Sequence, residues 1–88
     1  MVNVYVLHGA NGKRYVGIAN DLNRRMSEHR SGHTKGSQII GDFVLLHSEE
    51  YDNYTSARER EIYFKSGVGR KWLNAKYPRT GPARKYGG

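Results

Sequence analysis

Five residues of this sequence carry side chains that can bind a phosphate, hold a cation or move a proton: Tyr5, Tyr15, Arg25, His29 and Glu61. An arginine can bind a phosphate, and one carboxylate can hold a hard cation such as Mg²⁺ that keeps several of its waters. A tyrosine of lowered pKa, or a hydrogen-bonded chain through it, can take the proton from an attacking water. An unperturbed tyrosine, with a pKa of about 10, would be a poor base. The set is compatible with hydrolysis of a phosphodiester bond.

The two tyrosines are expected on neighbouring strands. Residues 2–7 place valines on one face and Tyr5 on the other, in the alternation typical of a strand. Residues 14–18 are again strand-like, and the Asn11-Gly12 pair between the two segments favours a tight turn. We therefore expect an antiparallel hairpin that brings Tyr5 and Tyr15 onto adjacent strands.

A helix is expected over residues 22–30, with Asn20 or Asp21 as its cap. An apolar stripe at helical spacing should face the sheet; it consists of Leu22, Met26 and His29. Arg25 lies beside this stripe, so its guanidinium should meet an anion. The alternative is that the Arg25 stem covers apolar surface while its charged head reaches water.

A carboxylate is expected on the buried face of a second helix, over residues 56–66. There Ala57, Glu61 and Phe64 share the face that should pack on the sheet, so Glu61 needs a partner or a cation. The alternative is an ion pair between Glu61 and Lys65 on the exposed side, worth only about 0.2–0.5 kcal/mol.

The segment before this helix contains a loop and a strand. Residues 31–38 are rich in Gly, Ser, Thr and Lys and predict a mobile basic loop. A third strand is expected at residues 42–47, followed by an acidic and aromatic turn that ends near Asn53. Ser56 and Glu59 then have the spacing of a capping box, which predicts the start of the second helix.

The C-terminal part is expected to end the fold. A glycine-containing break at residues 67–69 precedes a short final helix over residues 70–76. Residues 78–88 have the composition of a disordered basic tail, so residues 1–77 should form the single domain. The predicted fold class is α/β (α+β), with a small three-stranded, mostly antiparallel sheet flanked by three helices.

The net charge of +7 over 88 residues makes nucleic acid the first partner to consider, although such a charge can also serve solubility alone. The absence of cysteine excludes disulfides, thiolate zinc sites and cysteine nucleophiles. His8, His33 and His47 are too far apart for a recognisable zinc pattern and are expected at the surface. No secretion signal or long apolar segment is visible, so we expect a cytoplasmic protein without a membrane span.

Several motifs in order resemble the GIY-YIG endonucleases. The segment 4–6, ten residues before Tyr15-Val16-Gly17, resembles the two motifs that name the family. The turn at 20–22 and the Arg24-Arg25 pair with His29 resemble the helix that follows. Ala57, Arg60, Glu61 and Lys65, followed by residues 66–73, resemble small stand-alone members.

This resemblance implies a role for each matched residue. Tyr5 and Tyr15 would flank the nucleophile, with Tyr5 the preferred general base. Arg25 would bind the scissile phosphate, His29 would assist by proton transfer or hydrogen bonding, and Glu61 would hold a single Mg²⁺ or Mn²⁺ ion. Asn74 is the best match to the final asparagine of the family. Five further basic residues are predicted to contact nucleic acid: Lys13, Arg24, Lys35, Arg70 and Lys71.

The sequence departs from the family pattern in two ways. The first motif reads Asn3-Val4-Tyr5, without its glycine and isoleucine, although the strand character and the tyrosine remain. These 88 residues are also expected to form one domain, without a second, DNA-binding domain. Specificity for double-stranded or branched DNA should therefore come from DNA shape, from a protein partner or from dimerisation, and the chain is expected to be a monomer or weak dimer. Repair, recombination, restriction and mobile-element transfer all use such nucleases.

Two alternatives to an endonuclease remain. The first is a catalytically silent nucleic-acid-binding module of the same fold; Glu61 argues against it, because a carboxylate beside Arg25 would repel phosphate unless a cation intervened. The second is a structural protein of RNA complexes, since the basic loop around Lys35 and the basic tail would suit RNA equally well.

Overall fold

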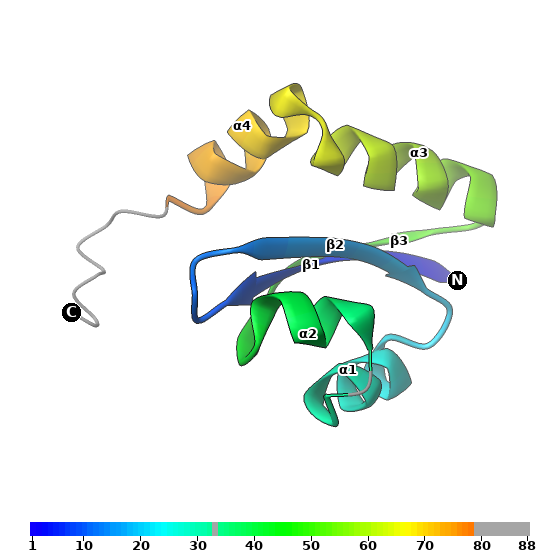
Figure 1. The fold of residues 1–88 in the computed structure, drawn as a ribbon. Coiled ribbons are helices and arrows are strands. Elements are labelled where there is room, and N and C mark those ends of the chain that lie inside the picture. Colours follow the sequence, from blue (N-terminus) through cyan, green and yellow to red (C-terminus); the bar gives the residue numbers. More distant parts are fainter. Residues whose placement is uncertain (33, 79–88) are drawn as a thin grey trace.

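The computed structural model describes residues 1–32 and 34–78. The elements are β1 (Val2–Gly9), β2 (Arg14–Ala19), α1 (Leu22–Arg30), α2 (Lys35–Ile40), β3 (Phe43–Tyr51), α3 (Tyr54–Lys65) and α4 (Gly67–Lys76). The sheet has the order β2-β1-β3, and both strand pairs are antiparallel. Figure 1 shows α3 and α4 over one face of this sheet and α1 and α2 over the other. The prediction of a small three-stranded antiparallel sheet with flanking helices is confirmed.

The central strand β1 is buried on both faces, so its alternating side chains enter two separate cores. Val4 and Val6 pack with residues of α3 and α4, among them Phe64. Tyr5 and Leu7 point to the opposite face; the buried residues packed with them are Met26 of α1 and Ile40 of α2. The valine face therefore fixes α3 and α4, and the Tyr5 face fixes α1 and α2.

The first three elements form as the sequence predicted. β1 and β2 are a hairpin in which Tyr5 pairs with Gly17 and Leu7 with Tyr15, so both tyrosines lie on the same face of the sheet. α1 has the expected bounds, and its N-cap is Asp21, whose side chain accepts the Arg24 N–H at 3.0 Å.

The prediction of a mobile loop at 31–38 is wrong, because helix α2 begins within this segment, at Lys35; the structure therefore has four helices among the described residues and not three. Thr34 and Ser37 form a reciprocal capping box: the Thr34 hydroxyl accepts the Ser37 N–H at 3.0 Å, and Ser37 Oγ accepts the Thr34 N–H at 3.3 Å. Ile40 is buried against the sheet. The capping box and the burial of Ile40 stabilise a helix here although the composition of the segment is typical of a loop.

Three predicted boundaries are also corrected. The third strand continues to Tyr51 and so includes most of the expected turn. The cap of α3 is Asn53, whose side chain accepts the Ser56 N–H at 2.8 Å, so Ser56 lies inside the helix. The expected glycine break is instead the first turn of α4, capped by Ser66, whose side chain accepts the Gly69 N–H.

The predictions for His33 and for residues 79–88 of the tail fall outside the described residues. No helix in the described part of the chain is long and apolar enough to cross a membrane.

Candidate active site

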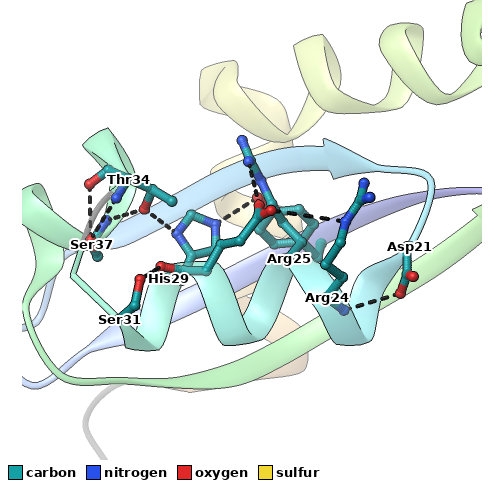
Figure 2. Close-up of polar contacts among 9 residues, drawn as sticks. Asp21, Arg24, Arg25, His29, Ser31, Thr34 and Ser37 are labelled. Carbon is teal, nitrogen blue, oxygen red and sulfur yellow. Dashed lines mark hydrogen bonds and ion pairs between the residues drawn. The ribbon is translucent and has the colours of Figure 1, made fainter.

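Tyr5 and His29 form a buried hydrogen-bonded pair between β1 and α1. The Tyr5 hydroxyl oxygen lies 2.8 Å from His29 Nε2, and both residues are almost fully buried, at 0% and 1% exposed. His29 reaches the sheet because it stands on the inner face of α1, one turn after Arg25. Figure 2 shows Arg25 and His29 projecting from α1 on the side where the sheet lies.

Tyr15 completes an aromatic cluster around this pair. Its ring centroid lies 6.4 Å from that of Tyr5 and 5.5 Å from that of His29. Two glycines make the cluster possible. A β-carbon at Gly17 would meet the Tyr5 hydroxyl, and one at Gly36 would come within 2.9 Å of both the His29 and the Tyr15 ring. Neither glycine was singled out from the sequence as a site residue.

The surroundings of the pair fix its protonation. Burial raises the pKa of Tyr5, and the charges of Tyr15 and Glu61 add to this effect. The Arg25 guanidinium lies close enough to the hydroxyl to act in the opposite direction, without reversing the shift. Burial, with the Arg25 charge, lowers the pKa of His29. At neutral pH, Tyr5 is thus a phenol beside a neutral imidazole.

Arg25 lies at the rim of this cluster. Its Nη1 donates to Glu28 at 3.0 Å, and the two side chains are 39% and 44% exposed. The anion expected beside Arg25 is therefore a carboxylate of its own helix. An exposed pair of this kind contributes little to stability, so a phosphate could replace Glu28 at small cost. Arg24 lies 3.9 Å from the same carboxylate and is more exposed.

Glu61 occupies the buried face of α3, as predicted, and is 7% exposed. Both of its oxygens are paired: Arg58 Nη1 donates to Oε1 and Lys65 Nζ to Oε2, each at 3.0 Å. The two readings of Glu61 from the sequence are therefore both partly correct, since the carboxylate is buried and also pairs with Lys65. Glu61 stands on α3, which packs on the face of the sheet opposite to Tyr5, and its charge is the smallest of the effects that raise the pKa of Tyr5.

The donor chemistry of Glu61 fits a hard divalent cation. Its two partners, Arg58 and Lys65, have side chains 56% and 54% exposed, so either can turn into water when a cation takes the carboxylate. In residues 1–32 and 34–78 there is no cluster of three or more His, Cys, Asp or Glu side chains that could hold a metal. A cation at Glu61 would therefore take most of its other ligands from water and substrate.

A groove of about 640 Å³ follows the edge strand β2, where the two helical layers meet. Its lining includes residues of the hairpin, of α2, of α3 and of α4: Lys13, Arg14, Tyr15, Ile39, Lys65, Arg70 and Asn74. Asn74 does not join the Tyr5 cluster; its Oδ1 accepts from Arg14 Nη1 at 2.7 Å. Tyr15 lines the groove and also contacts His29, so the groove leads to the buried pair.

The five predicted nucleic-acid contacts are not all near this groove. Lys13 and Arg70 line it. Arg24, Lys35 and Lys71 are exposed on α1, α2 and α4 and do not belong to its lining. The structure thus brings together Tyr5, Tyr15, Arg25 and His29 on one face of the sheet. It places Glu61 on α3, which packs on the opposite face, and Asn74 in the adjoining groove.

The comparisons with known proteins identify the family. The family model described as the GIY-YIG catalytic domain matches residues 1–76. The chain therefore belongs to the GIY-YIG family.

Its relatives are small proteins of similar length. A UPF0213 protein of Halobacterium salinarum is 33% identical over 69 residues, which cover 74% of this chain and 86% of the relative. A UPF0213 protein of Staphylococcus aureus is 30% identical over 71 residues, covering 80% and 87%. The solution NMR structure of a UPF0213 protein from Bacillus halodurans superimposes with a TM-score of 0.55, at 26% identity, and covers 91% of this chain and 89% of that one.

Proposed function

We propose that this protein is a divalent-metal-dependent DNA endonuclease that hydrolyses phosphodiester bonds. The observation that carries the proposal is the 2.8 Å contact between the Tyr5 hydroxyl and His29 Nε2, with Arg25 at its rim. A neutral imidazole that is hydrogen-bonded to a phenol can accept a proton, and buried groups with shifted pKa values cluster at active sites.

The pair resolves the difficulty that tyrosine is a poor base. As a water attacks phosphorus, its proton passes to the Tyr5 oxygen while the Tyr5 proton passes to His29 Nε2. The phenol ends unchanged and the imidazole ends protonated, so no free phenolate is required. The bond from phosphorus to one sugar oxygen breaks, and that oxygen leaves with a proton from solvent. The lowered pKa of His29 keeps the imidazole neutral and ready to accept.

Arg25 and a cation bound by Glu61 would hold the scissile phosphate. Arg25 exchanges its exposed Glu28 partner for phosphate oxygens, which suit the planar guanidinium. Glu61 would hold a Mg²⁺ or Mn²⁺ ion, which supplies charge neutralisation at the phosphate and at the leaving oxygen. Tyr5 and His29 are buried, so the half-exposed side chains beside them, Arg25 and Tyr15, would have to move when the substrate binds for the attacking water to reach the Tyr5 oxygen.

The basic groove along β2 would bind the DNA backbone beside this site. Lys13, Lys65 and Arg70 provide positive charge within one groove. Contacts of this kind position DNA without reading its sequence. A monomer with one such site should nick one strand, and a double-strand break would need two protomers or two visits.

A non-catalytic nucleic-acid-binding module is the second candidate. It is favoured by the two ion pairs that occupy both oxygens of Glu61, because they give the carboxylate a structural role without any metal. The two candidates differ in whether the protein cuts DNA and, if it does, whether cutting requires Glu61.

Conversion of supercoiled plasmid to nicked and linear forms, with Mg²⁺, Mn²⁺ or EDTA, tests the proposal. We expect metal-dependent nicking that Glu61→Gln abolishes and that the matched exposed variant Glu59→Gln on the same helix retains. Circular dichroism of both variants would confirm equal folding. Binding without cutting, on duplex, branched and single-stranded DNA in every metal, would favour the binding module.

A further inference from the structure

The other ring nitrogen of His29 contacts a residue that the proposed reaction has not used. His29 Nδ1 lies 2.5 Å from Thr34 Oγ1, so the histidine is held from both sides, by Tyr5 of β1 and by Thr34 at the start of α2. Figure 2 shows the imidazole between Thr34 and the sheet. Thr34 is itself fixed by the capping box with Ser37.

We infer that Thr34 is a positioning residue that sets the tautomer of His29 together with Tyr5: its hydroxyl accepts from Nδ1–H, which leaves Nε2 free to accept from Tyr5. This inference rests on the proposed function, because the tautomer matters for cutting only if Tyr5 and His29 move a proton.

The hydrogen-bond donors and acceptors of Tyr5, His29 and Thr34 support the tautomer of His29 with its proton on Nδ1. If Nε2 carried the proton, it would donate to the Tyr5 oxygen, and the hydroxyl proton of Tyr5 would have to find another acceptor. Tyr5 is 0% exposed, and Arg25, the other side chain of the described residues that hydrogen-bonds with it, can only donate. A buried hydroxyl proton without an acceptor is costly. This cost favours the tautomer in which the Tyr5 hydroxyl donates to Nε2.

The Thr34 hydroxyl can accept the hydrogen bond that this tautomer requires. With the proton on Nδ1, Thr34 Oγ1 accepts from His29 and from the Ser37 N–H, which uses both of its acceptor positions. Its own hydroxyl proton can point to water, because Thr34 is half-buried and not fully enclosed. Among the described residues, Thr34 is the polar partner found for Nδ1; the remaining ring neighbours of His29 are Tyr15 and Phe43.

The contact between Thr34 Oγ1 and His29 Nδ1 also suits the protonated imidazole that the proposed reaction forms. Once Nε2 has accepted the Tyr5 proton, both ring nitrogens are donors, and Thr34 Oγ1 accepts from Nδ1 before and after the transfer without rotating. Gly36 lets α2 approach closely enough for this contact, since a β-carbon there would lie 2.9 Å from the His29 ring.

The test uses three variants and two readouts. Thr34→Val keeps the shape but removes the acceptor, Thr34→Ser keeps the acceptor, and Ser37→Ala weakens the cap of α2 while the Thr34 hydroxyl remains. The readouts are the ¹⁵N chemical shifts of the His29 ring and the single-turnover nicking rate on plasmid DNA.

We expect wild type, Thr34→Ser and Ser37→Ala to carry the His29 proton on Nδ1. In Thr34→Val the Nε2–H form should become populated, and nicking should slow by up to about tenfold, the usual worth of one neutral hydrogen bond, with unchanged DNA affinity. A wild-type histidine protonated on Nε2, or equal slowing in Thr34→Val and Ser37→Ala, would overturn the inference. If the wild type cuts no substrate, the proposed function fails, while the ring shifts still decide the role of Thr34.

Discussion

Gly17 lies directly opposite Tyr5 in the β1–β2 ladder, and a β-carbon at position 17 would come within 2.5 Å of the Tyr5 hydroxyl oxygen. The last residue of the Tyr15-Val16-Gly17 motif therefore has a steric role: it leaves room for the phenol of the neighbouring strand. The motif thus supplies both Tyr15 and the space for the Tyr5 side chain, although the two tyrosine rings do not stack.

The first prediction concerns this contact. Gly17→Ala should displace the Tyr5 ring from His29, lowering the stability by about 1–3 kcal/mol, as overpacking of a core does, and abolishing most of the proposed cutting. Gly67→Ala is the matched control, because nothing lies within 4 Å of a β-carbon there. Urea unfolding of both variants gives the measurement, and equal midpoints for Gly17→Ala and wild type would show that the contact is not restrictive.

A second prediction concerns a polar network away from the candidate site. Glu49 on β3 accepts from Arg60 at 2.9 and 3.2 Å, from the Tyr51 hydroxyl, and lies 2.8 Å from His47 Nε2. Burial alone would raise the pKa of Glu49, but the hydrogen bonds from Arg60, His47 and Tyr51 outweigh it and lower the pKa to about 2.

The sign of the pH dependence follows from this depressed pKa. The carboxylate stabilises the folded state fully above its ordinary pKa of 4.5, and this contribution of about 3 kcal/mol at most is lost as the pH falls from 4.5 towards 2. Glu49→Gln should therefore be less stable at pH 7 and lose less on acidification. Urea midpoints at pH 7 and pH 3 check this against Glu50→Gln, an exposed neighbour on the same strand. Parallel acid curves for the two variants would contradict it.

The third prediction concerns the competition at Glu61. Arg58 and a divalent cation would bind the same carboxylate, so Arg58→Gln should lower the Mg²⁺ concentration for half-maximal cutting. An exposed ion pair is worth at most about 1 kcal/mol, which limits the change to about fivefold. DNA affinity measured in EDTA controls for the lost charge. A higher Mg²⁺ requirement would mean that Arg58 assists the metal.

The sequence was sufficient for the features that depend on local pattern. The valine alternation of β1, a cap at Asn20 or Asp21 and the position of Glu61 on the buried face of α3 all follow from spacing along one element; the structure selects Asp21 as the cap. The arrangement of the tyrosines followed from the Asn-Gly turn and the period of two in a strand.

The features that the sequence did not reveal depend on contacts between distant residues. Thr34 and Ser37 looked like loop residues because the usual capping box ends in Glu or Gln, not Ser. His47 was expected at the surface, yet its side chain is 11% exposed and contacts Glu49 and the Tyr77 hydroxyl, which lies 30 residues further along the chain. Gly69 looked like a helix break, but it is a glycine because a β-carbon there would collide with the backbone of Tyr63.

The last prediction distinguishes the groove from the rest of the basic surface. If DNA lies along β2, Lys13 and Arg70 neutralise phosphates, whereas Lys71, on the same helix as Arg70, does not line the groove. Each lost phosphate contact lowers the slope of log affinity against log salt by about 0.9. Lys13→Gln and Arg70→Gln should each show this loss and Lys71→Gln should not, as measured by fluorescence anisotropy with a labelled duplex from low to moderate salt. Equal losses in all three variants would mean that the whole basic surface, and not the groove, attracts DNA.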